Sequence, residues 1–157
     1  MEALKHFFKD NTGSALIWTI FLILILITLS VVVYSGVTVY AKYQSCETEV
    51  QRAATVTVDK NMENANVRDL MLDVPADSAA ESFYSNMTET GFVLEGGCWN
   101  RYENDRLIYS LEDMTVDVEN KTMSINATLA IPLPWDIGGM VEVSIPLNVR
   151  SSVLYIE

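Results

Sequence analysis

One long apolar run dominates the first third of the chain. No charged residue occurs between Asp10 and Lys42, and the stretch from Ala15 to Tyr34 contains 14 Leu, Ile, Val or Phe residues. A helix of about 20 apolar residues, rising about 1.5 Å per residue, spans the roughly 30 Å hydrocarbon core of a bilayer. The 14 side chains favour insertion by about 4 to 8 kcal/mol. The run therefore predicts a single transmembrane helix over residues 14–41.

The length and flanks of this run favour a membrane anchor. The run is longer than the roughly 7–15 apolar residues of a cleaved secretory signal. The remaining chain is too small to bury a helix that is apolar on every side. Lys5 and Lys9 precede the run, and positive flanking charge tends to stay in the cytoplasm. We therefore expect a single-pass protein of the cell membrane whose C-terminal domain is extracytoplasmic.

After the span the pattern changes to a helix with a single apolar stripe. Tyr43, Cys46, Val50, Ala53 and Ala54 recur at helical spacing, and polar residues fall between them. This spacing predicts an amphipathic extension that continues the membrane helix. The stripe must pack against either the C-terminal domain of its own chain or a neighbouring subunit, because an apolar stripe in water is unfavourable.

In the last third of the chain apolar residues recur with a period of two. Apolar and polar side chains alternate over 114–118, 123–133 and 141–149, and Asn120-Lys121 is typical of a turn between the first two runs. Alternation over such lengths predicts half-buried strands in an antiparallel meander. One face of that sheet needs a cover, for which the helical stripe at 43–54 is the obvious candidate.

Two local signals add to this domain. Ser78 and Glu81 match a capping box and predict a short helix over 78–90. Pro132 and Pro146 indicate strand ends, bulges or an edge strand, because proline cannot donate a hydrogen bond within a sheet.

Together these patterns predict an α+β fold, in which a long N-terminal transmembrane helix extends into an antiparallel β-meander of three or four strands. They assign no element to residues 55–76 and 91–106. The predicted parts are a leader (1–13), a transmembrane helix (14–41), an amphipathic helical extension (42–58) and an extracytoplasmic α+β domain (59–157).

The charge of the chain is strongly acidic and unevenly placed. The formal net charge is −11, and all of it follows residue 41, because Lys5 and Lys9 balance Glu2 and Asp10 before that point. Phosphate binding needs a basic patch, so the composition argues against nucleic acid as a partner.

The outer domain holds few groups that could carry catalysis. The only histidine is His6, in the leader, which removes Ser–His and Cys–His nucleophile pairs and histidine metal sites from the outer domain. Glu103-Asn104-Asp105 lacks the Gly and the distal Glu of a calcium-binding loop, and we interpret it as a solvated acidic loop. We therefore expect no enzymatic activity, no metal and no cofactor.

The two cysteines, Cys46 and Cys98, leave two alternatives open. Outside the cytoplasm they could form a disulfide. Closing a loop of this size would stabilise the fold by up to about 4 kcal/mol on the chain-entropy model. The alternative is a pair of buried free thiols.

The start of the chain is its most informative feature. A leader with two lysines ends in Gly13, Asn11-Thr12-Gly13-Ser14-Ala15-Leu16-Ile17-Trp18 opens the apolar helix, and Val50-Gln51-Arg52-Ala53-Ala54 lies in its continuation. These segments resemble the TadE-like family of minor pilins, or pseudopilins, of the bacterial tight-adherence (Flp) pilus system. The resemblance covers roughly residues 1–60, while the later architecture agrees in outline with a pilin-like lollipop.

The resemblance implies that a prepilin peptidase cuts after Gly13 and leaves Ser14 as the mature N-terminus. It implies the lipid bilayer, other pilins and pilus assembly proteins as partners, and a part in starting or assembling a pilus. The family often has a glutamate at the fifth mature position, where this chain has Trp18. One alternative is an uncleaved, membrane-resident assembly protein of the same family. Another is a membrane-tethered envelope binding or sensor domain with no filament role.

Overall fold

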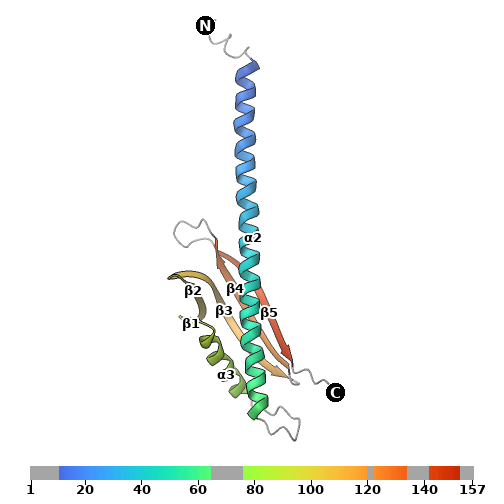
Figure 1. Ribbon diagram of the computed structural model, residues 1–157, viewed down its shortest axis with the longest axis vertical. Helices are drawn as coiled ribbons and strands as arrows, with labels where there is room; N and C mark the ends of the chain where they lie inside the picture. The colour runs from blue at the N-terminus through green and yellow to red at the C-terminus, as the bar shows by residue number, and fades with distance from the viewer. Residues whose placement is uncertain (1–10, 65–75, 120–121, 134–141, 153–157) are drawn as a thin grey trace. The chain divides into compact units, whose positions relative to one another are not determined.

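The computed structural model describes residues 11–64, 76–119, 122–133 and 142–152. The chain forms two compact units, Met1–Thr38 and Val39–Glu157. Helix α2 (Asn11–Asn64) begins in the first unit and ends in the second, where α3 (Ala76–Glu89) and one sheet follow (Figure 1). The strands of the sheet are β1 (Phe92–Glu95), β2 (Cys98–Glu103), β3 (Arg106–Glu119), β4 (Thr122–Pro132) and β5 (Glu142–Ser152).

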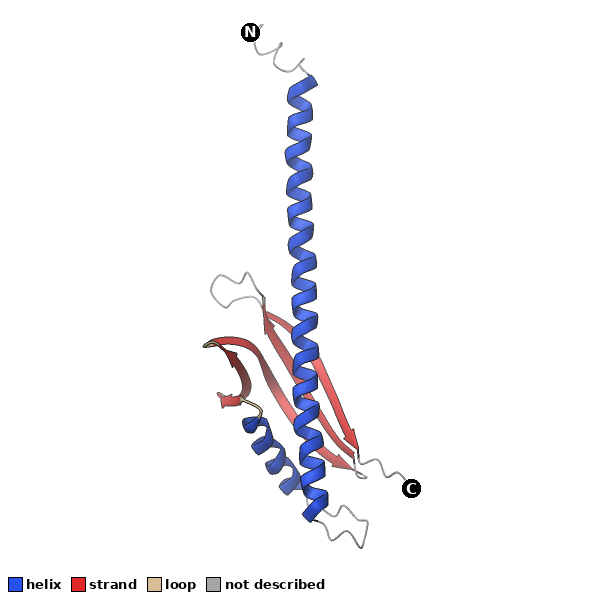
Figure 2. Ribbon diagram, in the orientation of Figure 1, coloured by secondary structure: helices blue, strands red, loops and turns tan. Residues whose placement is uncertain are grey.

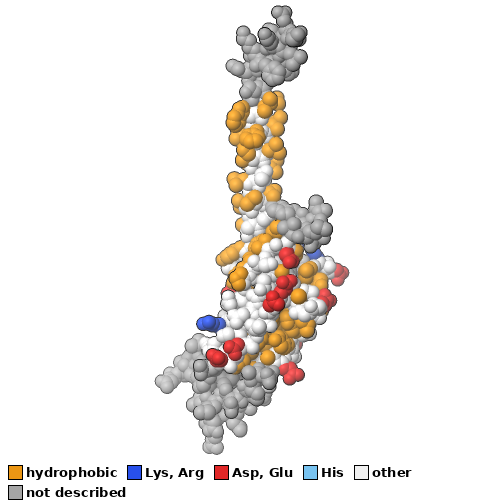
Figure 3. Space-filling view, turned by 180° about the vertical axis from the view of Figure 1, so that it is seen from behind, with side chains coloured by type: hydrophobic (Ala, Val, Ile, Leu, Met, Phe, Trp, Pro, Cys, Tyr) orange, Lys and Arg blue, Asp and Glu red, His pale blue; other side chains and the backbone are white. Residues whose placement is uncertain are grey.

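In the first unit, α2 exposes apolar side chains on every side. All residues from 16 to 34 are exposed, and apolar side chains cover this stretch in the space-filling view (Figure 3). The hydroxyls of Thr28 and Ser30 donate to the carbonyls of Leu24 and Leu26, at 2.9 and 2.8 Å, so they are satisfied within the helix. Among the described residues, α2 is long and apolar enough to cross a membrane.

In the second unit, α2 presents one buried stripe to the sheet. Cys46, Val50, Ala53 and Ala54 are at most 1% exposed, and Tyr43 packs at the edge of the same core. Their partners in this core include side chains of β3, β4 and β5, so the stripe is covered by its own chain. Of the two covers that the sequence allows, the structure therefore shows the C-terminal domain.

Helix α2 continues past residue 58, where the predicted helical extension ends, and runs to Asn64. Thr57 and Val58 are β-branched and are weak helix formers. Both are buried, and the Thr57 hydroxyl donates to the Ala53 carbonyl at 2.8 Å. Burial of their side chains in the core outweighs the weak local propensity.

The sheet is an antiparallel meander with the strand order β1-β2-β3-β4-β5 (Figure 2). Leu111, Leu129 and Ile145 lie opposite one another across β3, β4 and β5. The expected α+β fold with an antiparallel meander is confirmed, but the described residues form a sheet of five strands where three or four were predicted. Strands β1 and β2 were missed because only Phe92 and Trp99 among their residues are buried, which leaves no alternating pattern.

The two prolines occupy the places that sheet hydrogen bonding allows. Pro132 is the last residue of β4, and Pro146 lies in β5, which forms an edge of the sheet. A strand interior tolerates proline at an edge because no neighbouring strand requires its missing N–H. The predicted turn at Asn120-Lys121 falls outside the described residues.

Two hairpins close with two-residue turns. Gly96 and Gly97 connect β1 to β2 with φ values of 62° and 87°, and Asn104 and Asp105 connect β2 to β3 with φ values of 50° and 60°. In each turn both central residues have a positive φ, which is typical of a type I′ turn. The twist of this turn matches that of the two strands it joins. The acidic segment 103–105 is therefore a hairpin tip.

Helix α3 lies on the same side of the sheet as α2 (Figure 2). It spans Ala76–Glu89, so it begins two residues before the predicted start at Ser78. Ala79, Phe83 and Met87 follow one another every four residues and are buried in the shared core.

Replacing Leu129 by Ala tests the core between helix and sheet. Leu129 is completely buried, so the truncation should lower the free energy of unfolding by about 2–5 kcal/mol. Leu94→Ala is the matched control, because Leu94 is 57% exposed and its loss should change stability by less than about 0.5 kcal/mol. Urea denaturation followed by circular dichroism measures both, and equal effects would contradict the placement of the core.

Candidate functional site

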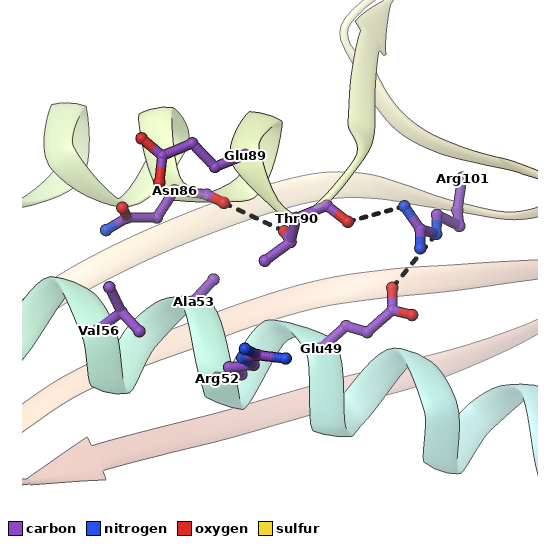
Figure 4. A pocket seen from close by; sticks show the side chains of 8 residues that line it. All are labelled: Glu49, Arg52, Ala53, Val56, Asn86, Glu89, Thr90 and Arg101. Carbon is purple, nitrogen blue, oxygen red and sulfur yellow. Dashed lines mark hydrogen bonds and ion pairs between the residues drawn. The ribbon is translucent and has the colours of Figure 1, made fainter.

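The end of α3, one face of α2 and strand β2 border an open pocket of about 420 Å³. On α2, Arg52 and Ala53 lie three and four residues after Glu49, and Val56 lies three residues after Ala53, so the four lie toward one side of the helix. The lining consists of Glu49, Arg52, Ala53 and Val56 from α2, Asn86 and Glu89 from the end of α3, Thr90 from the turn that follows it, and Arg101 from β2 (Figure 4).

Arg101 joins three parts of the fold at one end of this pocket. Its Nη1 donates to the Thr90 carbonyl at 2.7 Å, and its Nε lies 3.5 Å from Oε2 of Glu49. Its guanidinium carbon lies 5.8 Å from the centre of the Phe92 ring, within the range of a cation–π contact. The side chain is 29% exposed, so its contacts are less screened than those of a surface arginine.

Glu49 receives a second donor from the sheet. The Tyr109 hydroxyl donates to Oε2 of Glu49 at 2.8 Å. Burial, and then this hydrogen bond, raise the pKa of Tyr109, so the phenol remains a donor at physiological pH. Helix α2 is thereby held to β2 and β3 by a single carboxylate with two donors.

Asn86 lines the opposite end of the pocket. This side chain is only 4% exposed, and its Nδ2 donates to the Thr57 hydroxyl at 2.7 Å. Lys60 Nζ donates to Oδ1 of Asn86 at 2.9 Å and lies 3.6 Å from the Glu89 carboxylate. The Lys60–Glu89 pair adds little stability, because both side chains are more than half exposed. The main polar contact between α2 and α3 at this end is therefore the hydrogen bond from the buried Asn86 amide to Thr57.

Arg52 is the lining residue whose charge has no partner among the described residues. Its side chain is exposed at the pocket, and it forms no hydrogen bond or ion pair within the described part of the chain. Arg101 and Asn86 are already bound by their own chain. A ligand with a carboxylate would therefore be recognised first by Arg52, because guanidinium and carboxylate can form two parallel hydrogen bonds.

A second pocket, of about 570 Å³, lies between α3 and strands β1 to β3. Its lining includes Leu94 and Met114, together with Tyr84 and Trp99, whose rings stack at 5.6 Å with an interplanar angle of 17°. The stack is an internal contact between α3 and β2 that holds the hairpin to the helix.

The predicted cleavage residues, Gly13 and Ser14, lie in the first turns of α2. The predicted packing residues lie in the core described above, far along the same helix. The described residues contain no group of three His, Cys, Asp or Glu side chains able to hold a metal ion.

The two cysteines are not bonded in the structure. Cys46 is buried in the core and Cys98 is half-buried at the start of β2, and both are free thiols. Alternation along β2 places Cys98 on the face opposite to that of the buried Trp99. Burial, followed by the charges of Glu49 and Glu47, raises the pKa of the Cys46 thiol to about 12.

The sequence contained little sign of this pocket. Glu49 and Arg52 could have been noticed as an opposite-charge pair three residues apart on one helix face. Asn86 and Arg101 carry no local signal, because their roles depend on contacts with Thr57 and Glu49 far away in the chain.

Gly91→Ala should open the Arg101 end of the pocket. Gly91 has a φ of 95°, and an added Cβ would collide with the Arg101 guanidinium. The expected loss of stability is about 2–4 kcal/mol, from backbone strain and from displacement of Arg101. In an Arg101→Ala background only the backbone part, about 1–2 kcal/mol, should remain.

Gly96→Ala is the control for Gly91→Ala, because Gly96 also has a positive φ but has open space around its α-carbon. Thermal or urea unfolding of the single and double variants measures the difference. Equal losses for Gly91→Ala and Gly96→Ala would show that Arg101 is not fixed as described.

Thiol labelling distinguishes the two cysteines. In the native, unreduced protein we expect a maleimide to label Cys98 only, because Cys46 is completely buried and its thiol stays protonated. Denaturation without reductant should expose a second thiol, as counted by intact mass. If denatured, unreduced protein showed no free thiol, a Cys46–Cys98 disulfide would be established instead.

No model of a known protein family, no curated protein and no solved structure matches the chain. The resemblance to TadE-like proteins therefore depends on the residues at 11–18 and 50–54 of the sequence itself.

Proposed function

We propose that this protein is a membrane-anchored minor pilin or pseudopilin that takes part in assembling a tight-adherence type pilus. In this role it acts through protein contacts and carries out no catalysis. Its expected partners are the bilayer, other pilins and pilus assembly proteins, and a prepilin peptidase that removes the leader.

The observation that carries this proposal is the change of surface along α2. The helix exposes apolar side chains on all sides over residues 16–34, and farther along it buries a stripe against its own antiparallel sheet. A helix of this kind can be anchored in lipid at one end and be part of a folded domain at the other. Both properties are expected of a pilin-like subunit.

The exposed apolar part also offers a surface for neighbouring subunits. In a bilayer, helices associate through close packing, since lipid is as apolar as the side chains. The β-branched residues Val31, Val32 and Val33 are all exposed and have few rotamers to lose on packing.

The pocket favours a second candidate function, a membrane-tethered envelope domain that binds a ligand and has no filament role. Its volume of about 420 Å³ lies within the range of small-molecule sites, roughly 300–1,000 Å³. This candidate differs from the first in requiring no processing at Gly13.

The N-terminus of the protein purified from its native membrane separates the two candidates. For the pilin-like subunit we expect the chain to begin at Ser14, as read by N-terminal sequencing and intact mass. Gly13→Val should abolish processing, because a peptidase that cuts after glycine would meet a β-branched side chain. Gly36→Ala is the control, since it lies in open space within the same helix and should leave processing complete.

A wild-type chain that keeps Met1 would contradict the processed pilin and leave an uncleaved assembly protein or the tethered domain. A chain that begins at Lys42 would contradict the membrane anchor itself.

A further inference from the structure

We infer that the pocket at Arg52 is the docking site for the β2–β3 hairpin tip (Glu103–Arg106) of a second copy of this chain. The inference depends on charge and shape within the second unit and does not require the proposed pilus function. It assigns an occupant to a pocket that the fold leaves open.

Cations gather at this pocket although the chain is acidic overall. The formal net charge is −11, yet Arg52 and Arg101 line the pocket and Lys60 bonds two of the other lining residues. The described residues contain only three further Lys or Arg side chains, Lys42, Arg106 and Arg150. Because Glu49 and Glu89 also line the pocket, its charges are mixed in sign, and a segment that carries both signs suits it.

The two lining side chains that are most available to a ligand, Arg52 and Glu89, carry opposite charges. Arg52 has no hydrogen bond or ion pair within the described residues, and Glu89 has only its exposed pair with Lys60. A complementary ligand should thus present a carboxylate to Arg52 and a cation to Glu89.

The hairpin tip offers this pair of charges. Asp105 and Arg106 are adjacent, and all four residues of the tip are exposed. Their side chains form no hydrogen bond or ion pair within the described part of the chain. The turn closes in two left-handed residues, so the hairpin ends in a short tip whose four side chains are all exposed.

Four other acidic side chains of the sheet fit the pocket less well. Glu95 already accepts the Tyr102 hydroxyl at 2.7 Å. Glu112, Asp117 and Glu119 alternate along β3 on the face of the sheet away from α2, where acidic side chains are visible in Figure 3. A broad sheet face cannot insert into a pocket between two helices.

Reciprocal charge reversal tests the contact. Full-length chains carrying donor or acceptor fluorophores at the C-terminus are placed in phosphatidylcholine vesicles, and energy transfer is followed against protein density. We expect Arg52→Asp and Asp105→Arg each to weaken self-association about tenfold, because an attractive pair becomes repulsive. The double variant should recover to within about threefold of the wild type, since the pair is restored with its signs exchanged.

Arg150→Asp supplies the matched control, because Arg150 is an exposed arginine on β5, outside the pocket. Alone it should leave association unchanged, and combined with Asp105→Arg it should give no recovery. Wild-type chains that do not associate, single variants that associate as the wild type does, or a double variant that stays weak would each overturn the inference. The N-terminal processing test is a separate readout, so failure here leaves the proposed function untouched.

Discussion

Burial of one apolar stripe of α2 against the antiparallel sheet is the interaction on which the second unit depends. The stripe contributes small side chains, Ala53 and Ala54, beside Cys46 and Val50, and all four are at most 1% exposed. Small residues let the helix approach the sheet closely, so larger side chains from the strands, such as Leu129 and Ile131, can fill the space between them. Without this contact the apolar face of the meander would be open to water on the side that α2 now covers.

Helix α2 has two different kinds of surface along its length. From residue 16 to 34 every side chain is exposed and nearly all are apolar, which suits lipid and would be unfavourable in water. After Lys42, polar residues appear on every side except the stripe, which suits a helix between water and a protein core. Helix α2 can carry both kinds of surface without a break, because backbone hydrogen bonding within a helix is independent of what surrounds it.

Polar side chains around the pocket fix the positions of α2 and α3 relative to strands β2 and β3. At one end Glu49 accepts the Tyr109 hydroxyl and pairs with Arg101, and at the other end the buried Asn86 amide bonds Thr57. These contacts are directional, unlike the apolar core, and a half-buried carboxylate without its donors would be costly. They therefore define the position of the pocket walls, and they leave Arg52 as the group available to a partner.

The sequence by itself determined the elements whose side chains face a single environment. The uniform apolar run, the stripe at Tyr43–Ala54 and the strict alternation in β3, β4 and β5 are local patterns, because lipid, core and water each select side chains at a fixed period. Tertiary structure decided the rest. Strands β1 and β2 show almost no alternation, the end of α2 is stabilised by burial of Thr57 and Val58, and the pocket joins residues from α2, α3 and β2. Contacts between residues distant in the chain leave no periodic trace, so only the folded arrangement reveals them.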